Sequence, residues 1–216
     1  MNILSVNVGQ PRELQLEGRV VLTSIFKSPV QGRLKVQKHN IEGDRQADLR
    51  VHGGPNKAVY AYASESYSHW RQELPDSDLV FGAFGENLTL SGLTEEDAQI
   101  GDRYQVGSSV LEVTQPRMPC FKLNLRFNRG DMVKRFWRNG HSGIYFAIYE
   151  EGELQVGDEI HLLHREVNSV SIADVVRLYK RERHDPELLE RALRAPLSGS
   201  WKQEIREAWQ QLEMLR

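Results

Sequence analysis

The one cysteine of this 216-residue chain, Cys120, is the side chain best suited by its surroundings to do chemistry. It lies in a loop, residues 115–122, that follows an apolar run with the pattern of a buried strand at 110–114. Two prolines stop that strand and stiffen the loop, because proline has a fixed φ and donates no backbone hydrogen bond. Arg117 and Lys122 flank the cysteine, and positive charge favours the thiolate, which attacks electrophiles or binds metals. A small thiol that only packs in the interior is the alternative.

A second candidate for ligand binding is the polar segment at residues 43–57, which contains a Gly-Gly-Pro turn. Glycines let the backbone approach a ligand closely and expose N–H groups to anions. The segment carries four cationic or titratable side chains that can contact phosphate: Arg45, Arg50, His52 and Lys57. A solvated surface loop is the other interpretation of this composition.

His141 stands with Ser142 at the start of a strongly apolar run, residues 143–149. A histidine there either caps or covers the end of a strand, or serves as a catalyst. The sequence leaves both roles open.

The elements that must position these residues are mostly strands in the first three quarters of the chain. Short apolar or alternating runs between turn signals are typical of a barrel or sandwich, and they fall at residues 2–8, 18–26, 33–37, 58–62, 87–90, 104–106, 110–114 and 143–149. Helices are predicted at 64–74, with Ser64 as its cap, and at 131–138, with Gly140 where the helix would stop.

From residue 168 onward the pattern becomes helical. Three amphipathic helices are predicted, with a capping box at Ser171 and Asp174, a start at Asp185-Pro186, and a third helix from Ser198. Charges of both signs are mixed along them, with no basic face for nucleic acid. We expect the helices to dock against the β unit or a second subunit, so a homodimer is one arrangement that the sequence allows.

Bulk composition indicates a soluble globular protein. The formal net charge is -2 with a pI near 6.4, which gives no reason to expect nucleic acid or a membrane as a partner. One cysteine excludes an internal disulfide, so we expect a reducing cytoplasm. The N-terminus does not have the pattern of a signal sequence, and no run of about 18 apolar residues could span a bilayer.

Four motifs in order resemble those of the MOSC domain family, the molybdenum cofactor sulfurase C-terminal domain family. The last of them holds the sole cysteine, and the four are Gly43-Asp44-Arg45-Gln46-Ala47-Asp48, His52-Gly53-Gly54-Pro55-Asn56-Lys57-Ala58-Val59-Tyr60, Gly82-Ala83-Phe84-Gly85-Glu86-Asn87-Leu88 and Thr114-Gln115-Pro116-Arg117-Met118-Pro119-Cys120. The helical tail resembles the small domain that follows MOSC in the YiiM-like subgroup. The resemblance covers nearly the whole chain.

This resemblance implies a mainly β fold: a MOSC-type β-barrel with a few short helices over residues 1–167, followed by a small three-helix domain over 168–216. It implies that the barrel binds molybdenum cofactor, a molybdopterin, and that Cys120 ligates the molybdenum as a thiolate. A soft thiolate suits a metal that is already held by the sulfurs of a pterin dithiolene.

The resemblance also suggests seven cofactor-binding residues: Lys27, Arg45, Asp48, His52, Lys57, Asn87 and Arg117. The arginines and Lys57 suit the cofactor's phosphate, since arginine offers a fork of donors and lysine a point charge. Asp48 and Asn87 are candidates for hydrogen bonds to the pterin.

The implied reaction is reduction of the N–O bond of an N-hydroxylated compound, such as 6-N-hydroxylaminopurine, to the amine and water. The chain has neither a Gly-x-Gly-x-x-Gly fingerprint nor a cysteine cluster, so we expect an external flavoprotein to deliver the electrons. Cys120 and His141 are the predicted catalytic residues. The proton would come from His141 or from Tyr145.

Two other functions stay open at this point. The domain can bind molybdenum cofactor and pass it on as a carrier, without turnover of its own. A metal-free enzyme with Cys120 as nucleophile would need a histidine base, for which His141 and His52 are the candidates.

Overall fold

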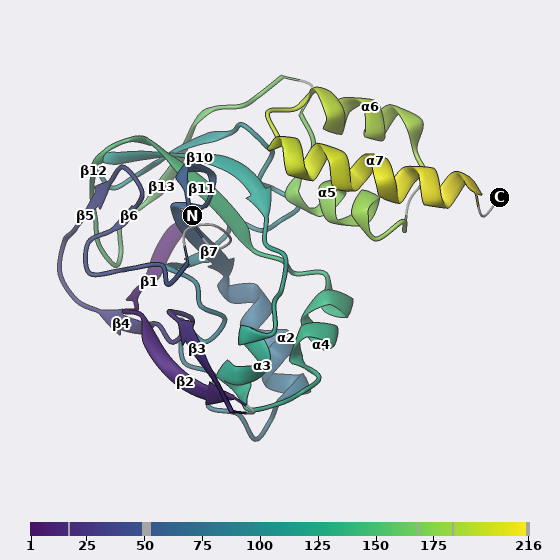
Figure 1. The fold of residues 1–216 in the computed structure, drawn as a ribbon. Coiled ribbons are helices and arrows are strands. Elements are labelled where there is room, and N and C mark those ends of the chain that lie inside the picture. Colours follow the sequence, from purple (N-terminus) through teal and green to yellow (C-terminus); the bar gives the residue numbers. More distant parts are fainter. Residues whose placement is uncertain (17, 49–52, 168, 183, 215–216) are drawn as a thin grey trace.

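The centre of the molecule is an eight-stranded sheet (Figure 1). This computed structural model describes residues 1–16, 18–48, 53–167, 169–182 and 184–214. The order across the sheet is β13-β9-β10-β11-β7-β8-β1-β4, and all neighbours are antiparallel except the parallel pair β7 and β8. The strands are β1 (Asn2–Val8), β4 (Ser28–Val30), β7 (Val59–Ala63), β8 (Leu88–Ser91), β9 (Arg103–Val106), β10 (Ser109–Pro116), β11 (Ile144–Glu150) and β13 (Ile160–His164).

The sheet curls until the start of β1 meets the turn before β13. Asn2 forms an isolated bridge with Glu159, and the Ile3 amide donates to the Asp158 carbonyl at 3.1 Å. Within the described residues no ladder joins the edge strands β13 and β4, because the three-residue β4 pairs with β1 alone. The predicted mainly β fold is confirmed, but the sheet is a curled open one where the sequence suggested a closed barrel.

Two small sheets flank the large one. The hairpin β2 (Arg12–Leu16) and β3 (Arg19–Thr23) leads into the segment that carries Lys27. A three-stranded sheet joins β5 (Leu34–Gln37) to β6 (Asn40–Ile41) and β12 (Gly152–Leu154). β3 lies within the predicted strand at 18–26, and β5 within the predicted strand at 33–37.

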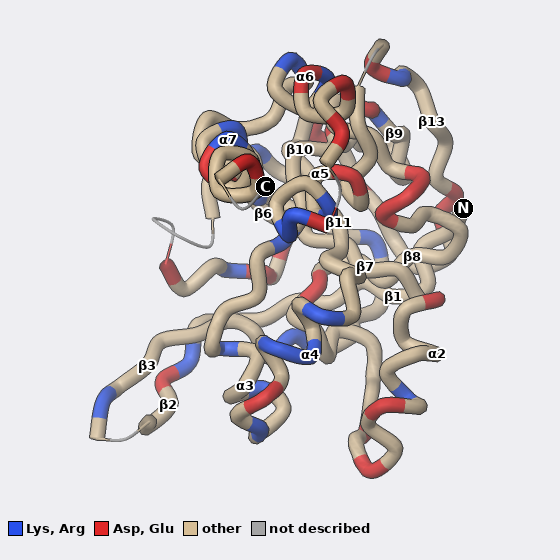
Figure 2. Tube along the Cα trace, turned by 90° about the vertical axis from the view of Figure 1, so that its right-hand side faces the viewer, with Lys and Arg blue, Asp and Glu red and all other residues tan. Residues whose placement is uncertain are grey.

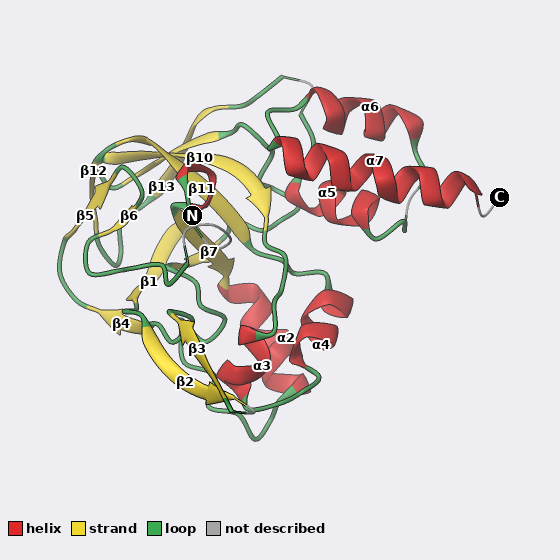
Figure 3. Ribbon diagram, in the orientation of Figure 1, coloured by secondary structure: helices red, strands yellow, loops and turns green. Residues whose placement is uncertain are grey.

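The helices form two groups (Figure 3). One group covers the end of the sheet nearest the cysteine loop and contains α2 (Ser64–Glu73), α3 (Lys122–Phe127) and α4 (Met132–Asn139); the other contains α5 (Ile172–Tyr179), α6 (Pro186–Arg194) and α7 (Gly199–Met214). Among the described residues, no helix is long and apolar enough to cross a lipid bilayer.

Helix ends follow the sequence signals in most cases. The Asp185 carboxylate accepts from the Leu188 amide at 2.9 Å, and the Ser171 hydroxyl accepts from the Asp174 amide at 3.0 Å. The prediction of Ser64 as a cap is wrong: α2 begins at Ser64 itself, whose hydroxyl donates to Glu65 Oε2. A serine caps only from the position before the helix, where its oxygen faces free amides.

The C-terminal helices pack on the sheet. A single apolar core contains Leu111 and Val113 of β10 together with Val175, Trp201 and Ile205 of the helices. Charged residues of both signs occur along α6 and along α7 (Figure 2). Docking against the β unit, one of the two predicted arrangements, is thus confirmed; the domain boundary at 167/168 stays a prediction.

Candidate functional site

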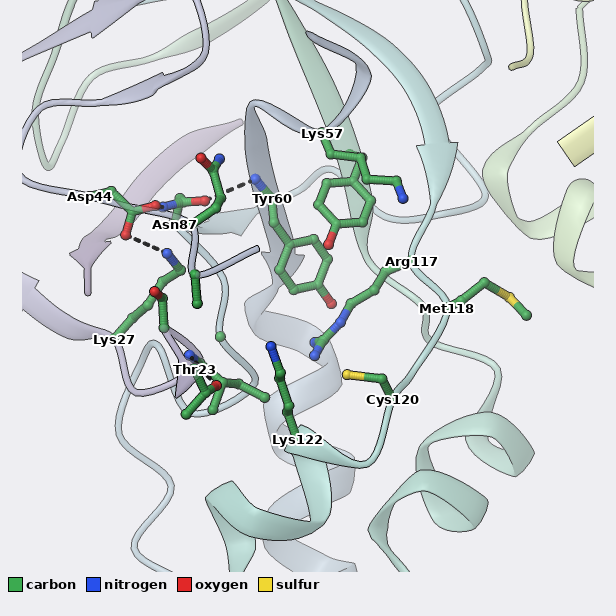
Figure 4. A pocket seen from close by; sticks show the side chains of 16 residues that line it. Thr23, Lys27, Asp44, Lys57, Tyr60, Asn87, Arg117, Met118, Cys120 and Lys122 are labelled. Atoms are coloured by element: carbon green, nitrogen blue, oxygen red, sulfur yellow. Dashed lines mark hydrogen bonds and ion pairs between the residues drawn. The ribbon is translucent and has the colours of Figure 1, made fainter. Parts of the chain in front are cut away.

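Cys120 lies in the wall of a cavity at the end of the sheet (Figure 4). Of the residues predicted from the sequence, Lys27, Lys57, Asn87 and Arg117 line the same cavity. They come from four segments far apart in the sequence. Figure 4 shows the Cys120 sulfur, the Arg117 guanidinium and the Lys122 ammonium pointing toward a common space.

Arg117 is held by its neighbours rather than left to move in solvent. Its side chain, 7% exposed, donates from Nη1 to the Phe84 carbonyl, and its guanidinium carbon lies 4.8 Å from the Tyr60 ring centroid and 5.4 Å from that of Phe136. Cations over aromatic faces are stabilised by the ring quadrupole, and more so when desolvated. Arg117 is therefore a fixed positive charge beside Cys120.

A buried carboxylate shapes the loop that supplies the Phe84 carbonyl. Glu86, fully buried, accepts hydrogen bonds from the Tyr67 hydroxyl, from the Gly82 amide at 2.8 Å and from the Phe84 amide at 3.1 Å. Burial raises the pKa of Glu86. Gly85 has φ +79°, and a Cβ there would lie 2.9 Å from an Ile25 side-chain carbon, so the turn requires glycine. This turn leads into β8, close to the predicted strand at 87–90.

A second fixed cation, Lys27, is paired with Asp44 at the opposite wall. The Asp44 carboxylate also accepts from the Gly9 amide at 2.8 Å and from Asn87 Nδ2 at 2.9 Å. Burial lowers the pKa of Lys27, and the Asp44 charge opposes that shift. Asp44 lies in the first of the four motifs but was not among the predicted site residues. Its role is to hold Lys27 and Asn87 in place, and sequence spacing does not reveal such a role.

Asn87 has partners at both ends of its amide. Oδ1 accepts from the Tyr60 backbone amide at 3.1 Å, and Nδ2 donates to Asp44. The amide thus ties β7 to the Lys27–Asp44 pair. Its role as a pterin contact stays a prediction; its observed contacts position other residues of the wall.

Two further cations complete the lining, Lys57 and Lys122. Lys57 ends the 3-10 helix η1 (Pro55–Lys57), and the Thr114 hydroxyl pins that helix to β10 by donating to the Asn56 carbonyl at 2.6 Å. Burial lowers the pKa of Lys57. Lys122 opens α3, a short helix that the sequence analysis did not predict.

Two tyrosines line the cavity, Tyr60 and Tyr145, with ring centroids 5.1 Å apart. The Tyr60 hydroxyl donates to the Ser142 carbonyl at 2.9 Å. Burial raises the pKa of both tyrosines, so both hydroxyls keep their protons at neutral pH. Gly143 leaves room for the Tyr60 ring, because a Cβ at that position would lie 2.5 Å from the Tyr60 hydroxyl oxygen.

Not every predicted residue is brought to this cavity. Arg45 is exposed and Asp48 is partly buried, and neither is among the described residues that line it. His52 and Arg50 lie outside the described residues. The roles of Arg45, Asp48 and His52 in cofactor binding stay predictions.

His141 lines a different cavity, between α4 and α5, so the structure does not place it beside Cys120. Its Nδ1 lies 3.7 Å from Glu95 Oε2, and this interaction raises the pKa of His141. Glu95 also accepts from the Gly143 amide at 2.7 Å. His141 lies just before the start of β11 and close to Glu95. Tyr145, the second residue of β11, lines the Cys120 cavity instead.

The side chains around Cys120 fit the cofactor that the sequence resemblance implies. They offer one soft sulfur ligand and four cations, Lys27, Lys57, Arg117 and Lys122, against the single carboxylate Asp44 among the described lining residues. Ser24 adds a buried hydroxyl oxygen with no hydrogen-bond partner in the described part of the chain. An anionic, sulfur-ligated metal group with a phosphate matches this donor set.

Comparison with known proteins identifies the family. The MOSC domain model matches residues 48–161, more than half of the chain, and the model of the YiiM-like 3-alpha helix domain matches residues 170–207. Protein YiiM of Escherichia coli is 34% identical over 182 residues, covering 83% of this chain and 81% of that protein. A protein of Gibberella moniliformis named Reductase is 33% identical over 199 residues, which is 91% of this chain but 35% of that longer protein.

Solved structures agree with the sequence comparisons. The crystal structure of YiiM from Geobacillus stearothermophilus matches with a TM-score of 0.79 and 35% identity, covering 96% of this chain and 98% of that one. The overall fold is therefore shared over nearly the whole length of both chains. This chain belongs to the MOSC domain family, in the YiiM-like group that carries a three-helix domain after the MOSC domain.

Proposed function

We propose that this protein is a molybdenum-cofactor-dependent reductase of N-hydroxylated compounds, among them 6-N-hydroxylaminopurine. The observation that carries the proposal is the Cys120 thiol in a cavity with four cationic side chains and one carboxylate. Membership of the MOSC family and a relative named Reductase support it. The same arrangement is less suited to a metal-free thiol enzyme, because His141, one of the two candidate bases, lines another cavity.

In this proposal the residues of the cavity hold and orient the cofactor. The Cys120 thiolate ligates the metal, while Arg117, Lys57 and Lys122 bind the phosphate and compensate anionic charge. Lys27 and Asp44 form the wall of the cavity that lies opposite Arg117. When bound, the cofactor supplies the two-electron and oxygen-transfer chemistry, with electrons delivered by an external flavoprotein.

The overall reaction consumes two electrons and two protons: R–NH–OH becomes R–NH2 and water. Tyr145 is the proton source in this proposal, because it lines the cavity with Cys120 and burial keeps its hydroxyl protonated. Tyr60 is less suited, since its hydroxyl already donates to Ser142.

The decisive experiment compares molybdenum content and turnover of wild type and Cys120→Ser, both purified from cofactor-replete cells. We expect about one molybdenum per wild-type chain and almost none in the variant, because serine lacks the soft sulfur ligand. Turnover of 6-N-hydroxylaminopurine with a flavoprotein donor is expected to fall in parallel. Met118→Leu is the matched control for molybdenum content, since it removes a neighbouring sulfur from the same cavity without removing the thiol.

Each outcome has a distinct meaning. Molybdenum in wild type without turnover on any N-hydroxylated compound would replace the reductase with the cofactor carrier. Molybdenum retained in Cys120→Ser would show that the thiolate is not required as a ligand. Absence of molybdenum from both proteins, with cofactor present in the cells, would refute the metal-dependent function.

A further inference from the structure

A second chamber adjoins the first and opens between the cysteine loop and the C-terminal helices. Four residues line both chambers: Lys57, Met118, Cys120 and Tyr145. Cys120 therefore stands where the two spaces meet. The second chamber has a wall that the first does not have, built by Tyr179 of α5 and Ser200, Trp201 and Glu204 of α7.

Two aromatic side chains form part of the helical wall. Tyr179 and Trp201 pack edge to face, with ring centroids 5.7 Å apart, and Trp201 is held in the core with 4% of its surface exposed. Met118, 40% exposed, adds a polarisable thioether from the loop side. Aromatic rings and thioethers pack well against planar rings.

The polar groups of this chamber are one cation, Lys57, which it shares with the first chamber, and several hydrogen-bonding groups. Gln115 is 5% exposed, and its side-chain amide makes no hydrogen bond to any described residue although it lines the chamber. An amide that faces a chamber can exchange its water contacts for hydrogen bonds to a ligand. An amide can donate to a ring nitrogen or accept from an N–H group.

Glu204 contributes a carboxylate at the outer rim. Burial raises the pKa of Tyr179, and the nearby Glu204 charge raises it further, which places the carboxylate close to that phenol. A carboxylate accepts from amino and ring N–H groups and repels anions. With one cation and one carboxylate among its described lining residues, this chamber suits a neutral base with N–H donors better than the phosphate that the four cations of the first chamber attract.

We propose that this chamber binds the ring of the substrate, a neutral, planar, nitrogen-rich heteroaromatic base whose exocyclic N-hydroxyamino group points toward Cys120. The inference rests on the proposed reductase function and assigns the substrate class to the three-helix domain. Gln115 and Glu204 hydrogen-bond the ring edge, and Tyr179, Trp201 and Met118 contact its faces and rim.

Binding of adenine, the amine product of 6-N-hydroxylaminopurine reduction, tests this placement by calorimetry on protein purified from cofactor-replete cells. Glu204→Gln is expected to weaken adenine binding about tenfold, because a charge-assisted hydrogen bond becomes a neutral one. Ser200→Trp fills the chamber from an exposed position on α7 and is expected to abolish binding. Glu207→Gln, an exposed glutamate one turn along the same helix, is the matched control and should bind as wild type does.

Turnover provides a second readout. Glu204→Gln is expected to raise KM for 6-N-hydroxylaminopurine about tenfold with little change in kcat, and to leave KM for N-methylhydroxylamine, which has no ring, unchanged. Molybdenum content measured on the same samples separates the two proposals. If wild-type protein binds adenine but contains no molybdenum, the assignment of this chamber to a base is supported and the reductase function is refuted.

Two results would overturn the assignment. If wild-type protein contains molybdenum but binds no adenine, the chamber does not bind a base. Equal adenine affinity in wild type and Ser200→Trp would place the ring elsewhere.

Discussion

The cavity at Cys120 and the cavity at His141 both collect charged side chains, yet they balance those charges differently. Around His141 the cations face carboxylates: His141 with Glu95, Arg177 with Glu96 and Lys180 with Glu182. Around Cys120, four cations line a space with one carboxylate, Asp44. The first set of charges is internally compensated, and the second has an excess of positive charge.

The difference bears on which cavity is the better candidate for binding a ligand. Opposite charges that pair with each other lower their own free energy and leave little field for a third group. Around Cys120 the described lining residues carry four cations and one carboxylate, so an anion that enters is stabilised. This contrast favours the Cys120 cavity as the candidate binding site more than the number of charged residues does.

The largest expected effect concerns the one carboxylate of the Cys120 cavity. Asp44→Asn should lower the free energy of unfolding by about 3 kcal/mol near neutral pH, because Lys27 is then buried without its counter-charge. The pKa of Lys27, already lowered by burial, falls further without Asp44, so the variant gains more stability than wild type as pH rises toward about 10.

Urea unfolding at several pH values measures this difference. Asp131→Asn, which alters an exposed carboxylate paired with Arg129, is the control. A loss of stability in Asp44→Asn no larger than in the control would show that the Lys27 charge is solvated, and the contrast between the cavities would weaken.

An intermediate effect is expected from removing one cation in each cavity. Lys122→Gln should weaken binding of inorganic phosphate to cofactor-free protein about fivefold, since one charge-assisted contact is lost at a partly exposed site. Lys180→Gln should leave phosphate affinity unchanged, because Lys180 is paired with Glu182. Calorimetry at fixed ionic strength gives both values. Equal losses in the two variants would mean that net charge, not the Cys120 cavity, attracts the anion.

The smallest effect concerns His141. Interaction with Glu95 raises its folded-state pKa, so the stabilisation is fully present below the unfolded value of about 6.5 and is lost as pH rises through the folded value. His141→Gln should therefore cost a few tenths of a kcal/mol at about pH 6 and nothing at about pH 9, because the pair is partly exposed.

Thermal unfolding at the two pH values measures this difference, and turnover is expected to stay at the wild-type level. Loss of turnover with unchanged molybdenum content would return His141 to the mechanism. An equal destabilisation at both pH values would show that packing, not charge, is what the substitution removes.

Much of the fold follows from local sequence signals. The strands at 2–8 and 58–62 and the helix starts at Ser171 and Asp185 appear within a residue or two of their predicted positions. These elements depend on alternation, apolar runs and caps, which act between neighbours in sequence. α3 was not predicted, because its six residues carry too short a pattern, and it is stabilised by packing of the buried Leu123.

The site was predictable only in part. Cys120, Arg117, Lys57, Lys27 and Asn87 were singled out from motifs and do line one cavity. Which wall each residue forms was not predictable, because that depends on strand order. Gln115 shows the limit: its place in the second chamber arises from the docking of α7, which is encoded more than 80 residues later.

By itself the sequence determined the candidate reactive group, the family and the order of the main strands and helices, because these depend on residue type and local spacing. Only the tertiary structure decided which charges compensate one another, that His141 and Tyr145 serve different cavities, and that the C-terminal helices complete a chamber at Cys120. The physical reason is that electrostatic balance and cavity walls depend on distances across the fold. Pairing of β7, β8, β10 and β11 sets those distances, and no local pattern records them.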